Sequence, residues 1–327
     1  VEVGWKSMLY LTLTGRNDWA SQLANSSTPC FFYPSVGLSG VISEMLTLPE
    51  FIDYMKVRGS FSSVGMPYPR NLTSPTYEYD EANQQWKPKT HYPIKDLKPE
   101  RTNSWELGLD MRLFKDFSLG FSWYLANTFN QTFYPKVSVS SGYSKIYLQT
   151  GYVRNSGVEL SLGYGHTWNN HLHWESNFTL SHNKNTIKDL VTSYIHPETG
   201  LPITQNRLDV GGLGKARFIL KKGGTLGDLY TQSDLKRDNS GMVEIDPSGA
   251  LTTEDNLPDI KLGSVFPKAN LAWNNRFEWR GVSLSALFTA RIGGIAYSAT
   301  QAAMDQYGVS ERSAQARDNG GVLLNGR

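Results

Sequence analysis

Apolar and polar residues alternate with a period of two over long stretches of this chain. A period of two places successive side chains on opposite faces of an extended strand, so each stretch predicts a β-strand with one apolar face and one polar face. The clearest stretch carries its apolar residues at Trp105, Leu107, Leu109, Met111 and Leu113, with Ser104, Glu106, Gly108, Asp110 and Arg112 between them. The pattern returns at Phe117, Leu119, Phe121, Trp123 and Leu125, and at Val158, Leu160, Leu162 and Tyr164.

One hairpin tests this interpretation. A two-residue turn makes its flanking residues pair and face the same way. Apolar residues lie at odd positions before Arg280–Gly281 and at even positions after it. A two-residue turn at Arg280–Gly281 therefore joins one apolar face to another, as hairpin geometry requires.

The whole pattern predicts about nine strands, several of them longer than the usual five or six residues. Such lengths suit a tilted membrane crossing, which needs roughly 9 to 11 residues. Short connections alternate with long ones, and aromatic residues gather beside the short ones, as in outer-membrane barrels with short periplasmic turns and long extracellular loops. The expected strands are 5–14, 32–43, 54–64, 102–114, 117–133, 155–168, 172–185, 268–279 and 282–293.

Composition narrows the class further. The chain has 327 residues, of which 39% are hydrophobic, and its mean hydropathy is −0.40. It has no run of about 18 uncharged apolar residues, so the sequence predicts neither a helical membrane span nor a signal segment. The net charge of +2 is spread along the chain, which argues against nucleic acid as a partner. The single cysteine, Cys30, excludes an internal disulfide framework and a cysteine-based metal site.

Several strings, in order along the chain, resemble the SusC/RagA family of TonB-dependent outer-membrane transporters of Bacteroidetes. They are TGRNDWAS from Thr14, YPSVGLSGVISEM from Tyr33, YMKVRGSFSSVG from Tyr54, LKPERTNSWELGLDMRLF from Leu97, RNSGVELSL from Arg154, FTARIGGIAYSATQAAMDQYGVS from Phe288 and ARDNGG from Ala316. Each string alone is weak, but their order and spacing together are specific.

The resemblance implies an all-β fold, a transmembrane antiparallel β-barrel of about 22 strands of which residues 1–327 supply a part. It implies an N-terminal plug domain and a TonB-contacting segment, neither of which lies in this sequence, so we expect the chain to be a fragment. It also implies a SusD-like surface lipoprotein as partner, the TonB complex as energy source, glycans or peptides as cargo, and no cofactor. Outer-membrane lipid would surround the barrel.

Two groups of residues are candidates for function. Aromatic side chains in the segment 65–101 suit stacking on sugar faces or protein contacts, and the candidates are Tyr68, Tyr77, Tyr79, Trp86 and Tyr92. Packing of these rings against the barrel wall is an equal alternative. Charged residues on the polar strand faces need water, which a barrel lumen supplies, and the lumen-facing candidates are Glu106, Asp110, Arg112, Glu159 and Arg291.

Other motifs are weaker. His171 and His173, with Glu175 beyond them, have a spacing that could hold a metal, but they lie at an expected periplasmic turn. The stretch from Asp238 to Asp246 lacks the acidic spacing of a calcium loop and favours a hairpin turn. We therefore predict no metal site, no catalytic residues and no enzyme activity.

Two further expectations concern the loops. The proline- and glycine-rich segment 186–267 should be an extracellular excursion, and 43–53 a short helical turn on the periplasmic side. The segments 65–101 and 298–327 should contact a lipoprotein lid or its cargo. The alternatives are a passive porin or a surface adhesion barrel, and, if the alternation is accidental, a soluble carbohydrate-binding β protein.

Overall fold

The computed structural model describes residues 1–24, 26, 29–69, 72, 77–88, 91–92, 98–133, 145–168, 171–195 and 202–321. The described residues form two compact units. The first comprises 1–208, 221–225 and 267–293, and the second comprises 209–220, 226–266 and the residues from 294 onward.

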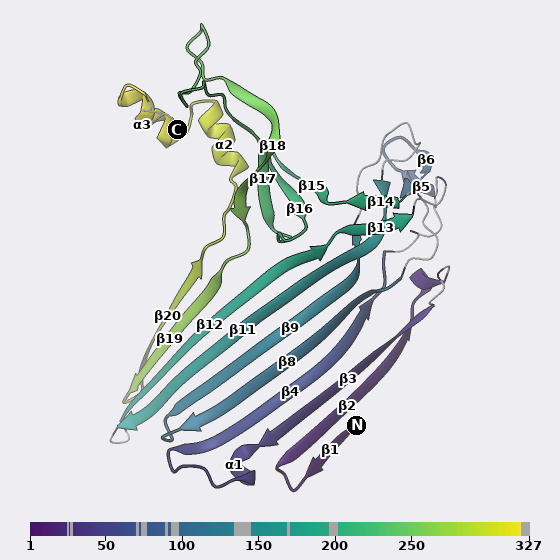
Figure 1. The fold of residues 1–327 in the computed structure, drawn as a ribbon. Helices are drawn as coiled ribbons and strands as arrows, with labels where there is room; N and C mark the ends of the chain where they lie inside the picture. The colour runs from purple at the N-terminus through teal and green to yellow at the C-terminus, as the bar shows by residue number, and fades with distance from the viewer. Residues whose placement is uncertain are drawn as a thin grey trace. The chain divides into compact units, whose positions relative to one another are not determined.

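The first unit is built on one antiparallel sheet of ten strands (Figure 1). The ten strands lie in the sheet in the order in which they follow along the chain, and the other strands lie in the connections between them. Because the order is linear, β1 and β20 are the sheet edges, and the described strands do not close into a barrel. The ten strands are β1 (Glu2–Trp5), β2 (Leu9–Trp19), β3 (Cys30–Val41), β4 (Ile52–Met66), β8 (Glu100–Leu113), β9 (Phe117–Phe133), β11 (Leu148–Trp168), β12 (Leu172–Asp189), β19 (Ala269–Trp279) and β20 (Val282–Ile292).

The connections alternate between short and long, as the sequence predicts. Connections of two or three residues lie at 6–8, 114–116, 169–171 and 280–281, and the ten-residue connection 42–51 lies at the same end of the sheet. The connections at the other end are 20–29, 67–99, 134–147 and 190–268. In an antiparallel meander, successive connections lie at opposite edges, so all the short turns share one end of the sheet. The turn at Arg280–Gly281 is confirmed, since Trp279 pairs with Val282 and both turn residues have positive φ angles of 47° and 84°.

The first expected strand is wrong in one respect. Of the expected strand 5–14, Trp5 is the last residue of β1, 6–8 form a turn and 9–14 belong to β2. Lys6 and Ser7 in the turn have φ angles of 48° and 56°. The turn went unnoticed because neither residue is a glycine or an asparagine, the types that adopt this conformation most easily.

Short elements occupy the connections of the first unit. The helical turn expected at 43–53 is α1 (Ile42–Met45). The long connections contain η1 (Ser21–Leu23), the hairpin of β5 (Tyr77–Asp80) and β6 (Gln85–Pro88), and the pair of β7 (His91–Tyr92) and β10 (Lys145–Ile146). A further pair joins β13 (Val191–Ile195) to β14 (Pro202–Gln205).

The segment 186–267 is more ordered than its proline content suggests. It completes β12 and then forms a four-stranded sheet of β15 (Arg207–Leu213), β16 (Ala216–Lys221), β17 (Asp228–Leu235) and β18 (Thr253–Ser264). Ile219, Leu229 and Tyr230 are buried in this sheet, with at most 6% of their surface exposed. The second unit also contains α2 (Ala299–Gln306) and α3 (Glu311–Asp318).

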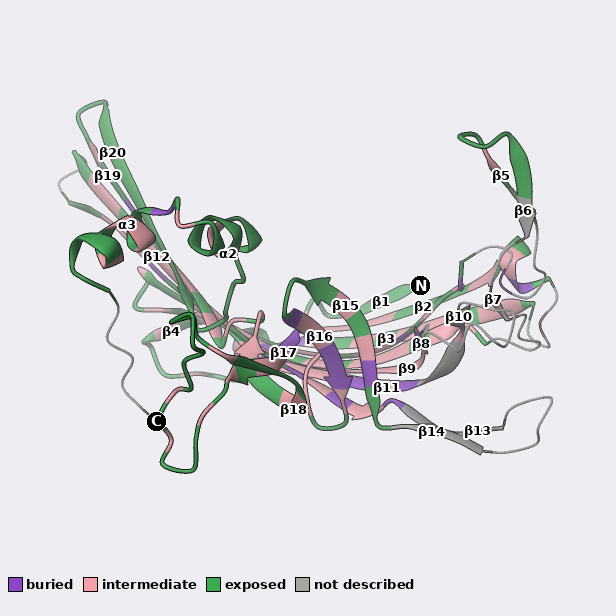
Figure 2. Ribbon diagram, turned by 90° about the horizontal axis from the view of Figure 1, so that it is seen from above, coloured by how far each residue is buried: buried purple, intermediate pink, exposed green. Residues whose placement is uncertain are grey.

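The ten-stranded sheet lacks the covered core of a soluble domain. Most residues along its strands are intermediate or exposed (Figure 2). Large apolar side chains are among the exposed ones, including Trp105 at 53%, Leu107 at 56% and Phe288 at 59%. An apolar face of this extent must be covered in the working protein. Among the described residues, no helix has the length and apolar character of a membrane span.

Candidate functional site

Strand register places all five charged candidates on one face of the sheet. Directly paired residues of antiparallel strands point to the same side. A row of directly paired residues can be followed across the strands from β4 to β20. In β8, Glu106, Asp110 and Arg112 lie on the same face as this row, because each is an even number of positions from Gly108, which belongs to the row. The row runs Arg58, Gly108, Ser122, Glu159, Ser181, Asn270 and Arg291.

The opposite face is apolar along the same strands. Leu109 pairs with Phe121, which pairs with Leu160, and the row continues through Leu180 and Leu271 to Ala290. Leu107 pairs with Trp123, and Trp273 pairs with Phe288. The sheet therefore has one polar and one apolar face, as the sequence parity predicts.

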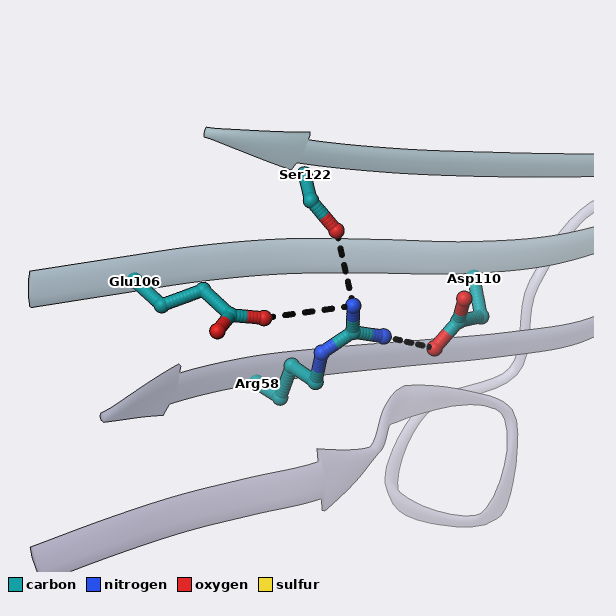
Figure 3. Close-up of polar contacts among 4 residues, drawn as sticks. All are labelled: Arg58, Glu106, Asp110 and Ser122. Atoms are coloured by element: carbon teal, nitrogen blue, oxygen red, sulfur yellow. Dashed lines mark hydrogen bonds and ion pairs between the residues drawn. The ribbon is translucent and has the colours of Figure 1, made fainter. Parts of the chain in front are cut away.

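Arg58 contacts three polar side chains on the polar face, and sequence reasoning missed it. Its guanidinium donates to Asp110 Oδ2 at 2.7 Å and to Ser122 Oγ at 2.7 Å, and it lies 3.4 Å from Glu106 Oε1 (Figure 3). The signal was present, because Arg58 alternates with the apolar Val57 in its strand. Its partners were not visible in the sequence, since they come from β8 and β9, 48 to 64 positions away.

Glycine makes this arrangement possible. Gly108 lies directly opposite Arg58, and a Cβ there would come within 2.6 Å of the guanidinium carbon. The absence of a side chain therefore lets Arg58 lie flat across β8 and reach Ser122 on β9. Tyr124 does the same over Gly157, donating its hydroxyl to Asn183 Oδ1 on β12 at 3.2 Å.

The row borders a groove with a volume of about 580 Å³. Its polar lining includes Arg58, Asp110, Glu159, Asn270 and Arg291. The volume lies in the range of small-molecule sites. With both signs of charge, hydroxyls and an amide, the lining can form hydrogen bonds to a polar solute.

The aromatic candidates divide into three cases. Tyr79 and Trp86 pair across the β5–β6 hairpin with ring centroids 5.2 Å apart, and they are 46% and 66% exposed. Tyr68 is 4% exposed, so its ring does not belong to this exposed pair. Tyr77 and Tyr92 lie in β5 and β7, but their side chains lie outside the described residues.

The weaker motifs have local partners. His173 Nδ1 lies 2.9 Å from Thr167 Oγ1, and Glu175 accepts from Asn177 Nδ2 at 2.9 Å. In the part of the chain that the structure describes, no three His, Cys, Asp or Glu residues are grouped so that they could hold a metal ion.

The stretch from Asp238 to Asp246 forms two successive turns. Asp238 Oδ1 accepts from the backbone of Ser240 and Met242 at 2.8 and 3.0 Å, and Asp246 Oδ1 accepts from Ser248 and Ala250 at 2.9 Å each. The Ser240 hydroxyl, followed by the backbone amides, lowers the pKa of Asp238 below its usual range. The hairpin turn expected for this stretch is confirmed.

Comparison with known proteins agrees with this architecture. The family model "TonB dependent receptor-like, beta-barrel" matches residues 1–241. TonB-dependent receptor P39 of Formosa agariphila is 24% identical over 262 residues, which are 76% of this chain and 22% of that protein. The chain therefore spans about a fifth of the length of this relative.

Solved structures show the same fold. The RagAB peptide transporter matches with a TM-score of 0.68 at 19% identity, over 88% of this chain and 32% of the other. The RagAB peptide importer in its open-open state matches with a TM-score of 0.64 over 90% of this chain and 32% of the other. Barrels of this family lie in the outer membrane. The chain belongs to the TonB-dependent receptor-like β-barrel family and is part of an outer-membrane barrel.

Proposed function

We propose that this chain supplies part of the wall of a TonB-dependent importer, and that its polar sheet face lines the lumen through which a glycan or peptide passes. The observation that carries the proposal is the row from Arg58 to Arg291, which is polar across seven adjacent strands while the opposite face is apolar. A barrel wall between lipid and water requires this division. A protein with this role needs no catalytic residues.

Within this proposal, Glu106, Asp110, Arg112, Glu159 and Arg291 face the lumen together with Arg58. Arg58 is held by Asp110 and Ser122, so its guanidinium is positioned before a solute arrives. A pre-positioned donor loses little conformational freedom on binding. Arg58 should therefore act in solute recognition and in orienting its two carboxylate neighbours.

The proposal includes two partners. A SusD-like surface lipoprotein would close the extracellular mouth, and the TonB complex would supply energy through a region of the protein outside this sequence. Similarity to the RagAB peptide transporter supports the first partner. The exposed pair Tyr79 and Trp86 is the best-defined surface for the lipoprotein or its cargo, because paired exposed rings mark binding surfaces.

Uptake by the full-length protein tests the proposed function. The nutrient is first identified from a panel of labelled glycans and peptides as the compound whose uptake depends on the transporter gene. Arg58→Ala should lower uptake about tenfold, since removing one partner of a charge-assisted network leaves the others unpaired. Arg280→Ala, which removes an arginine at a short turn, is the matched control and should leave uptake unchanged.

Energy dependence separates this proposal from a passive porin. Import driven by TonB stops when the TonB protein is deleted, whereas diffusion through a porin continues. Uptake that survives TonB deletion would contradict the importer and favour the porin. Normal uptake by an assembled Arg58→Ala variant would show that Arg58 takes no part in recognising the solute.

A further inference from the structure

The apolar face contains a groove beside the short turn that joins β8 to β9. Its walls carry aromatic and aliphatic side chains, and its volume is about 430 Å³. Phe117 and Tyr164 pair across β9 and β11 with ring centroids 4.7 Å apart, and Leu119 and Leu162 pair in the next row of the same face. Phe178 of β12 completes that second row. The groove therefore lies over β9, β11 and β12, which pair without a register shift at these residues.

The turn is held in an unusual conformation that helps to form the groove. Phe114 and Lys115 have φ angles of 51° and 66°, which side-chain-bearing residues adopt at a cost of about 1 kcal/mol each. The backbone N–H of Phe114 donates to the Phe51 carbonyl at 2.9 Å, and that of Lys115 donates to Asp53 Oδ2 at 2.5 Å. The Phe114 ring stacks on Phe51 and is 63% exposed, so it forms an open wall at the turn.

Charged groups lie at the turn end of this groove. Asp116 Oδ2 and His166 Nδ1 are 2.8 Å apart, and the imidazole stacks on Tyr164, which lines the groove. Lys115 is exposed and precedes Asp116 directly. Lys115 and Asp116 are thus consecutive residues of the turn, and the contact between Asp116 and His166 links the turn to Tyr164 in the groove lining.

We propose that this groove binds one acyl chain of a phospholipid from the periplasmic leaflet, with an ammonium-bearing headgroup held at the turn. The short turns of outer-membrane barrels are periplasmic, so the groove opens to that leaflet. Its apolar lining matches the acyl chain. Lys115 complements the lipid phosphate and Asp116 complements the headgroup ammonium. An anionic headgroup without an ammonium would pair with Lys115 alone.

Native mass spectrometry of the delipidated full-length transporter tests the site. Phosphatidylethanolamine should bind with an apparent Kd about tenfold below that of phosphatidylglycerol, the gain expected from one charge-assisted contact. Asp116→Asn should bring the two lipids to within about twofold. Leu162→Trp, which fills the groove from its floor, should weaken phosphatidylethanolamine binding about tenfold.

Leu107→Trp is the matched control for the groove-filling variant. Leu107 lies on the same apolar face and is 56% exposed, but it does not line the groove, so its variant should bind lipid as the natural protein does. Equal binding of both lipids, unaffected by Leu162→Trp, would mean only annular lipid and would overturn the proposal. A co-purifying protein in place of lipid would also overturn it.

Assembly and function are controlled separately. Resistance of each variant to unfolding by detergent at room temperature shows that its barrel has assembled. If Leu162→Trp does not assemble, Asp116→Asn still decides the headgroup preference. Lipid binding is measured on the purified protein and import is measured as uptake by cells. A failure of the import proposal would therefore leave the lipid result unchanged.

Discussion

An arginine placed on the apolar face of β8 should destabilise the barrel according to its depth in the membrane. Leu107 lies six residues from Leu113, the last residue of β8 before the short turn. At about 3.3 Å per residue and a tilt of about 45°, this separation gives a height of about 14 Å, near the middle of an apolar band about 25 Å tall. Leu107→Arg should therefore cost about 2–4 kcal/mol.

Three further positions on the same strand calibrate this value. Leu109 is closer to the turn, so Leu109→Arg should cost less than Leu107→Arg, and Leu113→Arg, near the interface, about 0–1 kcal/mol. Ser104 lies on the polar face, since it alternates with Trp105, and Ser104→Arg should have little effect. The series compares depth and face on one strand with the same introduced residue.

The assay is urea unfolding of the full-length transporter in lipid vesicles, followed by the loss of its compact mobility in electrophoresis. The free energies of unfolding should rank Leu107→Arg lowest, then Leu109→Arg, then Leu113→Arg. Equal losses for Leu107→Arg and Ser104→Arg would refute the assignment of the two faces. A loss below about 0.5 kcal/mol at Leu107 would place that position outside the membrane.

Three further predictions follow from single contacts. Gly108→Ala should displace the Arg58 guanidinium and destabilise the barrel by about 1–3 kcal/mol, measured by the same unfolding assay, whereas no effect would mean that Arg58 lies elsewhere. Replacing Tyr79 and Trp86 by Ala should weaken lipoprotein association by about 2 kcal/mol or more and slow growth on the imported nutrient, and unchanged association and growth would reduce the pair to loop packing. The pKa of Asp238 is lowered in the fold, so the carboxylate stabilises the turn fully above its ordinary pKa, and this stabilisation is lost as the pH falls through the lowered pKa. Hydrogen exchange of the Met242 amide, corrected for the intrinsic rate, should speed up over that fall in pH in the natural protein. The same rate should not change with pH in Asp238→Asn.

Much of the ten-stranded sheet could be predicted because each strand carries its own pattern. The alternation at 105–113 and the parity change across Arg280–Gly281 depend on local residues, and the structure confirms both. The turn at Lys6–Ser7 and the sheet of β15 to β18 were not predicted. The turn at Lys6–Ser7 lacks the residue types that usually adopt positive φ angles. In the sheet of β15 to β18, prolines and glycines interrupt the alternation of apolar and polar residues. The burial of residues such as Ile219 therefore becomes visible only once the strands have paired.

The sequence by itself determined which residues share a strand face, because a period of two is a property of one extended segment. It therefore identified Glu106, Asp110, Arg112, Glu159 and Arg291 as polar-face residues without knowledge of their neighbours. Only the tertiary structure decided that the row runs from Arg58 to Arg291 and that Arg58 joins Asp110 to Ser122 across Gly108. The groove beside the β8–β9 turn likewise depends on the pairing of β9 with β11. Register between strands joins residues far apart along the chain, and a local pattern carries no information about which partner stands opposite.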